Sequence, residues 1–267
     1  MSEFLRVTLL MNKQLQQIID EYKKQTERKC CVIEVTEEIP DILDNKIGGV
    51  PYIPVTEKCP VDENGEPMAL LLQINCKDIS LPSFPQDGVL EIFAPAELTW
   101  PWNCVIKYYS ENQKYQTDLP YVNFKDFVCL RGYKINIKHG VEYMPTSDYR
   151  CDGVVEEITK QVTGKDIKGY FGLSDIFSQE DGKSASEIFY DAVVGNYVTV
   201  GGYADFTQED IRPREANGMN VCLFKLDSCV DMKKFDIGDA GILCVLISEE
   251  DLKNRNFEKA FLTWDCC

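Results

Sequence analysis

Three short segments of this chain recur, in the same order, about 150 residues further along, and this repeat constrains the fold more than any other feature. The separations between matched positions are 153, 152 and 153 residues, so the register holds to within one residue. The matched segments are residues 48–52 with 201–205, 72–75 with 224–227, and 87–90 with 240–243. Glycine before a strand is common in any β protein, which is the alternative explanation. The shared order and spacing favour an internal duplication.

The repeat predicts how the chain builds a core. One unit covers about residues 46–110 and the other about 199–264, and each contains a Gly-Gly turn, a strand, a loop, an apolar strand, a turn with glycine and a further apolar strand. Such a unit exposes one apolar face, so two copies gain by packing against each other. We therefore expect residues 1–267 to form a single, mainly β (β-rich α+β) domain whose duplicated halves share one core.

A helix is expected near the start of the chain. Leu15, Ile18, Ile19 and Tyr22 have the spacing of one helix face, and Asn12 is a suitable residue to begin it. The predicted helix spans about residues 12–27. Its apolar stripe is expected to face the core rather than a membrane or a partner.

The rest of the chain reads mostly as short strands. Apolar or alternating runs separated by turn residues predict strands at 31–35, 68–74, 89–93, 105–109 and 134–138. Residues 152–194 are more helical in character, and Ser184 is expected to cap a helix there. Ser248, followed by three acidic residues, predicts another capped helix.

Charge excludes several classes of function. The 267 residues include 44 acidic and 28 basic side chains, which gives a formal net charge of −16. Nucleic-acid binding requires clustered Lys and Arg, and anionic membranes attract the same residues, so neither partner is expected. The N-terminus has no secretory signal pattern, and the apolar runs are strand-sized. We expect a soluble, cytoplasmic protein.

The twelve cysteines predict neither a metal site nor a disulfide scaffold. Pairs 30–31 and 266–267 are adjacent, Cys-x-x-Cys does not occur, and His139 is the only histidine. Most of the cysteines lie in apolar runs, where a thiol packs as a small hydrophobic group. We expect reduced structural cysteines, with no metal and no cofactor, and a spatial Cys–His139 pair remains an open alternative.

Several segments together resemble a known family. They are Lys46–Pro54, Leu71–Asn75, Gly201–Tyr203, Phe206–Asp210, Gly238–Gly241 and Asn256–Cys267. In this order they are similar to the YwqG-like bacterial proteins, from about Glu34 to the end of the chain. The resemblance implies a duplicated, mainly β fold of roll type with a few peripheral helices. It implies no activity, because that family is biochemically uncharacterised.

This chain departs from the family pattern at four positions, all in the second repeat. Ala204 and Ile211 occupy positions where proline is usual, Lys225 a position of glutamine, and Ile237 a position of tryptophan. If relatives carry a site in the second repeat, these departures bear on whether it is intact.

Polar residues within the two repeats are the candidates for binding a ligand or a partner. The set is Gln73, Asn75, Gln208, Asp210, Arg212, Asp227 and Asp239. Arg212 has two possible roles, because its guanidinium can bind a ligand's carboxylate or phosphate, or it can hold Asp210, Glu209 or Asp239 in an internal ion pair. We favour the internal ion pair. Gln73, Asn75 and Asp227 occupy related strand positions, and their simpler role is to satisfy backbone groups where the two halves meet.

Two functions remain in competition, and no catalytic residue is assigned to either. The first is a non-enzymatic protein-interaction module, with Trp100, Trp102, Tyr108 and Tyr109 as anchors and a basic protein as partner. An inhibitor or immunity-type protein would use this physics. The alternative is a small-molecule-binding or hydrolytic protein with a polar cleft between the two repeats, which would use Arg212 and Asp239.

Overall fold

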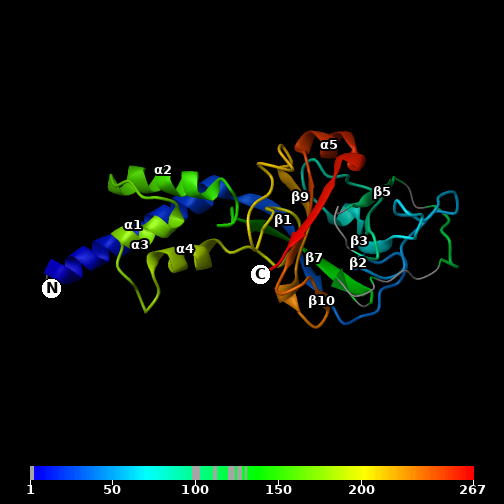
Figure 1. The fold of residues 1–267 in the computed structure, drawn as a ribbon, viewed down its shortest axis with the longest axis horizontal. Coiled ribbons are helices and arrows are strands. Elements are labelled where there is room, and N and C mark those ends of the chain that lie inside the picture. The colour runs from blue at the N-terminus through cyan, green and yellow to red at the C-terminus, as the bar shows by residue number, and fades with distance from the viewer. Residues whose placement is uncertain (1–2, 98–102, 111–112, 120–123, 125–127, 130) are drawn as a thin grey trace. The chain divides into compact units, whose positions relative to one another are not determined.

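A computed structural model describes residues 3–97, 103–110, 113–119, 124, 128–129 and 131–267, with side chains from residue 13 onward. The chain forms two compact units. The helical unit consists of residues 1–28 and 141–196, and the sheet unit of 29–140 and 197–267. Each is described by itself below (Figure 1). Within the described residues, no helix has both the length and the apolarity needed to cross a bilayer.

The helical unit packs four helices around the stripe that the sequence predicts. They are α1 (Glu3–Thr26), α2 (Cys151–Thr163), α3 (Leu173–Ile176) and α4 (Ala185–Val193), with a 3-10 turn η2 (Tyr170–Gly172) before α3. Leu15, Ile18, Ile19 and Tyr22 are all buried, which confirms that this face points into a core. Tyr22 also donates a hydrogen bond to the Met144 carbonyl at 2.9 Å.

The start of α1 differs from the prediction. The helix begins at Glu3, so Asn12 lies inside it and does not cap it. Leu9, Leu10 and Met11 precede Asn12 and are strong helix formers. Asparagine inside a helix costs only a fraction of a kcal/mol, so these residues carry the helix through it.

Both predicted serine caps are confirmed. Ser184 begins α4 with a capping box, in which its own N–H donates to Glu187 Oε2 at 2.7 Å while its Oγ accepts from the Glu187 N–H. Ser248 begins α5 (Glu249–Asn254), and its Oγ accepts from the Asp251 N–H at 3.0 Å. Caps of this kind stabilise a helix by about 0.5–2 kcal/mol each.

The sheet unit is built on one curled antiparallel sheet, and the prediction of a mainly β fold is confirmed. Ten strands follow the order β12-β11-β9-β8-β1-β7-β2-β3-β4-β5. Their bounds are β1 Arg28–Val35, β2 Lys46–Ile47, β3 Ala69–Asn75, β4 Val89–Ala94, β5 Val105–Tyr109, β7 Tyr133–Glu142, β8 Val198–Gly201, β9 Val221–Asp227, β11 Ile242–Ile247 and β12 Phe261–Asp265. A small second sheet pairs β6 (Val128–Cys129) with β10 (Phe235–Asp236). The five strands that the sequence predicts lie within β1, β3, β4, β5 and β7 to within a residue.

The two halves of the large sheet have matching registers. One cross-strand row runs through Lys46, Gln73, Glu91 and Lys107 on β2, β3, β4 and β5. The corresponding row on β8, β9, β11 and β12 runs through Thr199, Lys225, Cys244 and Thr263. Residues 46, 73 and 91 are separated from 199, 225 and 244 by 153, 152 and 153 positions, the spacing of the sequence repeat.

Irregular features of the two halves also coincide. Leu71 is skipped in the residue pairing between β3 and β4, and Leu223 is skipped in the pairing between β9 and β11. Each half therefore has a β-bulge at the same place. A 3-10 turn follows in both, η1 (Cys76–Asp78) and η3 (Ser228–Val230). Gly48 and Gly201 have φ values of +68° and +74°, and a Cβ on either would come within 3 Å of a neighbouring side chain.

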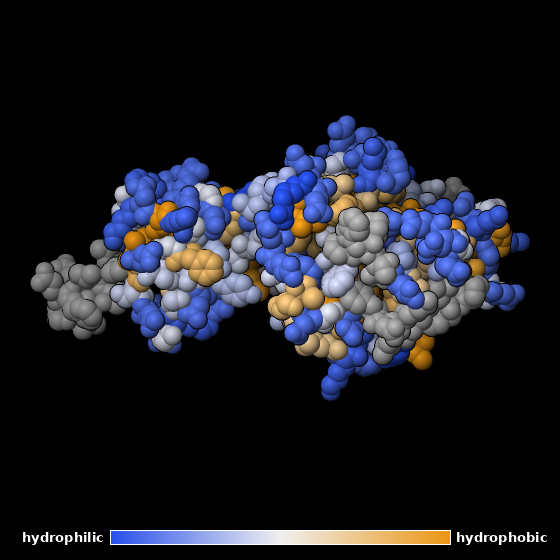
Figure 2. All heavy atoms as spheres, viewed as in Figure 1, coloured by the Kyte–Doolittle hydropathy of each residue, from blue (hydrophilic) through white to orange (hydrophobic). Residues whose placement is uncertain are grey.

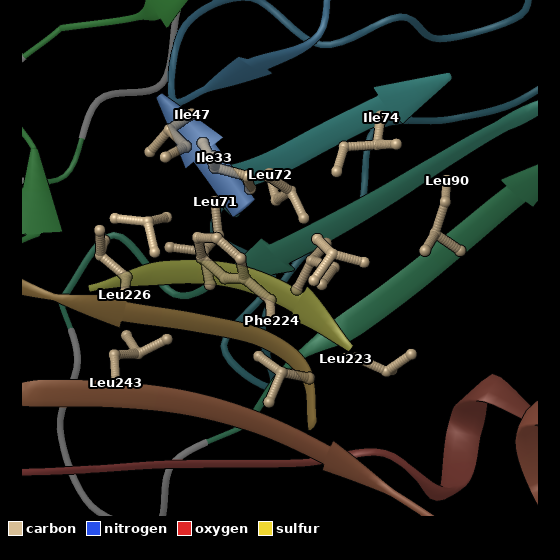
Figure 3. Packing of buried hydrophobic residues seen from close by; sticks show 14 of the residues in the cluster. Ile33, Ile47, Leu71, Leu72, Ile74, Leu90, Leu223, Phe224, Leu226 and Leu243 are labelled. Carbon is tan, nitrogen blue, oxygen red and sulfur yellow. The ribbon is translucent and has the colours of Figure 1, made fainter. Parts of the chain in front are cut away.

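One hydrophobic core serves both halves. Leu72, Ile74 and Leu90 from the first half belong to the same buried cluster as Phe224 and Leu226 from the second (Figure 3). The inner face of the curled sheet therefore buries apolar side chains that neither half could cover by itself. Their burial stabilises the fold by about 25 cal/mol per Å² of apolar surface removed from water.

The junction of the halves was not predicted. β1 and β7 are neighbours at the centre of the sheet, where β1 pairs with β8 and β7 pairs with β2. The Thr36 N–H donates to the Lys134 carbonyl at 2.9 Å next to this junction. These two strands lie outside the repeated segments in the sequence. The repeat alone therefore does not show that β1 extends the sheet of the second half and β7 that of the first.

A leucine pair tests the shared core. Leu226 is fully buried, whereas Leu43 is 47% exposed. We expect Leu226→Ala to lower the free energy of unfolding by about 2–5 kcal/mol, because it removes buried methyl groups and leaves a cavity. Leu43→Ala should change the free energy by no more than about 0.5 kcal/mol. Urea unfolding of both variants measures the difference, and equal losses would contradict this account of the core.

Candidate binding site

An open pocket of about 330 Å³ lies on the second half of the sheet unit. One wall comes from the loop after β8 and the other from β12. The loop contributes Phe206, Gln208 and Arg214, among others, and the β12 segment contributes Trp264 and Asp265. The pocket thus combines the Phe206 ring with charged and amide groups, as small binding sites commonly do. The Trp264 ring packs against the core on the other face of β12, where Trp264 pairs with Leu243.

An ion pair fixes the loop that forms the first wall. Asp210 and Arg212 are both buried, and Arg212 Nε donates to Asp210 Oδ1 at 2.9 Å. The Arg212 guanidinium also lies 5.7 Å from the centre of the Phe206 ring, a pocket wall. Of the two roles considered for Arg212, the structure shows the internal ion pair. A buried pair contributes little net stability, but it holds the loop in one geometry.

Gln208 connects the two walls. Its backbone N–H donates to Asp265 Oδ2 at 2.8 Å, and its side-chain amide donates to the Cys266 carbonyl at 2.6 Å. Burial, together with the nearby charge of Asp205, raises the pKa of the Asp265 carboxyl. The carboxyl is therefore held in the pocket by hydrogen bonds from the loop rather than by a basic side chain.

The pocket has the chemistry of a receptor for a cation on an apolar stem. Phe206 offers an aromatic ring, and Asp265 offers a carboxylate whose desolvation a cation would offset. Arg214 at the rim already has a partner, since its guanidinium lies 2.9 Å from Glu209. An exposed pair of this kind is weak and rearranges easily.

Two other predicted residues of the second half lie outside the pocket lining. Asp227 opens η3, where its Oδ1 accepts from the Cys229 N–H at 2.8 Å, and burial raises the pKa of its carboxyl. The side chain of Asp239 is exposed, while its carbonyl accepts from the Cys267 N–H at 3.1 Å. Both serve the local backbone.

Gln73 and Asn75 belong to the first half and are not brought to the pocket. The Gln73 amide donates to the carbonyls of Ile42 and Asp44 and accepts from the Tyr52 N–H at 2.9 Å. The Asn75 N–H donates to Asn45 Oδ1 at 2.7 Å. The Gln73 side chain thus satisfies backbone groups, but those groups lie within the first half and not where the two halves meet. At Asn75 it is the backbone N–H that is satisfied, by the side chain of Asn45.

Sequence reasoning missed a buried carboxyl beside Gln73. Glu91 is fully buried on β4, where its Oε1 accepts from the Tyr52 N–H at 2.7 Å. Its Oε2 meets no hydrogen-bond donor within the described part of the chain. Burial raises the pKa of Glu91 to about 8, although Tyr52 and Lys46 act in the opposite direction.

Lys46, across Gln73 in the same row, is the second buried charge. Its ammonium donates to the carbonyls of Asp41 and Ile42 at 3.0 and 2.8 Å. Burial lowers its pKa to about 8. A signal for Glu91 was present in the sequence, since an acidic residue interrupts the otherwise apolar run 89–94. Nothing comparable marks Asp265, which gains its role from Gln208 on a loop 57 residues away.

The possible pair of a cysteine with His139 is present as a contact, but the thiol is not activated as a nucleophile. Cys31 Sγ lies 3.8 Å from His139 Nδ1. Burial raises the pKa of Cys31 to about 11, so the thiol stays protonated at neutral pH and is unreactive. All twelve cysteines are free thiols. Among residues that the structure describes, no group of three or more metal-binding side chains converges.

The four predicted aromatic anchors have different positions in the structure. Trp100 and Trp102 lie outside the described residues. Tyr109 is only 6% exposed and packs edge-on against Tyr52, so its prediction as a surface anchor is wrong. It lies on the same face of β4 and β5 as Glu91, under the loop that carries Tyr52. Tyr108 is half-buried and donates to Asp87 at 2.8 Å.

Comparison with known proteins places the chain in a family but gives it no activity. The family described as "Domain of unknown function (DUF1963)" matches residues 45–266. The match includes both halves of the sheet and the pocket, and it leaves out α1 and β1. No curated protein matches the chain.

The buried Glu91 predicts a specific pH dependence. Because its pKa is raised in the folded state, the folded protein retains a proton that the unfolded chain releases. The contribution of Glu91 to stability is therefore complete below about pH 4.5 and is lost as the pH rises towards 8. Within this range its slope is at most about 1.4 kcal/mol per pH unit.

Glu91→Gln should remove that slope while keeping an oxygen to accept from the Tyr52 N–H. Urea unfolding between pH 5 and 7.5 measures the slope. The lowered pKa of Lys46 makes stability depend on pH only at higher values, between about 8 and 10.5. The control is Glu63→Gln in an exposed turn, which should keep the wild-type slope. Equal slopes in all three proteins would show that Glu91 ionises as it does in water.

Proposed function

We propose that this chain, which belongs to the DUF1963 family of domains of unknown function, is a non-enzymatic interaction module for a basic protein. The observation that carries this proposal is the pocket on the second half, where the Asp265 carboxyl and the Phe206 ring line the same open space. A lysine or arginine side chain of the partner would place its stem against Phe206 and its charge beside Asp265. This is the geometry that cation recognition requires.

The net charge of −16 supports the same class of partner. A strongly acidic surface raises the encounter rate with a basic protein and suppresses binding of acidic ones. An inhibitor or immunity-type role in the cytoplasm would use these properties. The buried Asp210–Arg212 pair supports a preformed site, because a loop that is already ordered loses less entropy on binding.

Two finer assignments accompany this proposal. The chain is proposed to be YwqG-like within its family. It is also proposed to descend from a duplicated unit, which the paired registers, the two equivalent bulges and the two 3-10 turns support. A duplication leaves one copy free to diverge on its outer face while the inner face continues to form the core.

A small-molecule function is the second candidate. The volume of about 330 Å³ lies at the lower end of the range for ligand sites. The pocket is lined by the second half alone, so it differs from the cleft between repeats that the sequence suggested. A thermal-shift screen of metabolites tests this alternative, since a bound ligand raises the apparent stability.

The cationic pocket is tested with blocked amino acids as probes. N-acetyl-arginine amide and N-acetyl-lysine amide should shift the backbone N–H signal of Gln208, which donates to Asp265, in NMR titrations, and uncharged N-acetyl-norleucine amide should shift it much less. Asp265→Asn should weaken the binding of both cations roughly fivefold to tenfold, about 1–1.4 kcal/mol, because the charge is lost. Asparagine retains an oxygen to accept from the Gln208 N–H, so the loop should stay in place.

The matched control is Asp239→Asn, which removes a charge from the same half outside the pocket lining. It should leave the affinity within about twofold. Equal binding of norleucine amide and arginine amide, or no effect of Asp265→Asn, would rule out the cationic pocket. At the level of the whole protein, recovery of partner-free monomer from native lysate at low salt would count against the interaction role.

A further inference from the structure

The helical unit has a pocket of its own, about 350 Å³ in volume, between η2 and α4. Tyr170 and Phe171 of η2 line one side, and Ser186, Glu187 and Tyr190 of α4 line the other. Neither the sequence repeat nor the site on the sheet unit involves these residues. On the face that Figure 2 shows, this unit carries hydrophobic atoms among mostly hydrophilic ones.

The aromatic side of the pocket is held in place. Tyr170 and Phe171 lie with ring centres 4.2 Å apart, and Tyr170 is stacked at 6.1 Å on Phe189, which is fully buried. The Tyr170 N–H donates to Asp152 Oδ1 of α2 at 3.0 Å. Phe171 is nevertheless 69% exposed, so a large apolar ring is presented to solvent from a fixed support.

The outward face of α4 continues this surface. Glu187, Tyr190 and Asp191 follow the i, i+3, i+4 spacing of one helix face, Val194 follows as the C-cap of the helix, and all four are exposed. Tyr190 and Val194 are 47% and 52% exposed. Apolar groups gathered in this way around a pocket typically mark a site where a partner docks.

The charge around the pocket selects the kind of partner. Lys183 is engaged by Asp191 in an ion pair. Hydrogen bonds from Ser184 lower the pKa of Glu187, which keeps its carboxylate ionised at the rim. Glu180 and Asp181 are exposed in the turn before Lys183. Among the charged residues that line the pocket, Glu187 and Asp191 outnumber Lys183, so the pocket complements basic residues of a partner.

We propose that this pocket docks an aromatic or large aliphatic side chain flanked by lysine or arginine on a partner protein. The apolar side chain would contact Phe171 and Tyr190, while its basic neighbours would face Glu187 and the acidic turn. The inference deepens the proposed function, because it adds a second contact for a basic protein, but it rests on different residues from the cationic pocket.

Short peptides test the site on the full-length protein. The probe is acetyl-Lys-Lys-Trp-Lys-Lys-amide, titrated into ¹⁵N-labelled protein while the backbone amides of α4 and η2 are followed by NMR. These amides should shift in a saturable manner. Replacing the tryptophan of the probe with serine, or its lysines with glutamate, should weaken binding at these amides at least fivefold.

Variants assign the contact to Phe171. Phe171→Ser should weaken binding of the tryptophan probe about tenfold, as expected for an aromatic hot spot. Its thermal unfolding should stay close to wild type because the ring is exposed. Tyr149→Ser is the control, since Tyr149 is 57% exposed in the same unit and does not line the pocket. It should bind the probe as wild type does.

Asp265→Asn separates this inference from the function proposed above. It should leave the α4 shifts unchanged even if it abolishes binding at the cationic pocket, and Phe171→Ser should leave that pocket unaffected. The inference is overturned if the α4 amides do not shift, or if the serine or glutamate probe binds as well as the original. It is also overturned if sedimentation shows a wild-type dimer that Phe171→Ser dissociates, because the occupant would then be a second copy.

Discussion

The sheet unit depends on burial of one apolar surface that belongs jointly to two halves of the chain. Ile74 of β3 and Leu226 of β9 occupy equivalent positions and lie in the same cluster. Neither half has a second layer of its own to cover this face, so the curled sheet itself supplies the cover. The inner face is thus the least free to change, and differences between the halves are expected on the outer face.

The outer face shows that divergence residue by residue. Gln73 and Glu91 of the first half correspond to Lys225 and Cys244 of the second. In the first half, the loop that carries Tyr52 closes over Glu91 and shields it from water. In the second half, the loop after β8 is tied down by Asp210 and Arg212 and leaves a pocket beside β12. The same scaffold therefore holds a closed polar cluster on one half and an open site on the other.

Local features were predictable because their causes lie close together in the sequence. Ser184 and Ser248 cap helices through contacts three residues away, and Arg212 finds its partner two residues away. The pocket has no such local cause, since Gln208 and Asp265 meet only after β12 has joined the sheet. The pairing of β1 with β7 is equally remote, because it closes a loop of about 100 residues. Long-range pairings of this kind follow from the hydrophobic pattern of the whole chain, which no single segment reveals.

Acidity alone would make this protein attractive to many basic molecules and selective for none. Long-range charge mainly raises the rate of encounter, whereas discrimination comes from contacts that only the correct partner satisfies. Asp265 is suited to such discrimination, because burial has already removed part of its hydration and a poorly fitting cation would not restore it. Phe171 adds an apolar contact that charge cannot replace. The combination of a diffuse negative field with two small, well-supported contact sites favours a specific basic partner over nonspecific attraction.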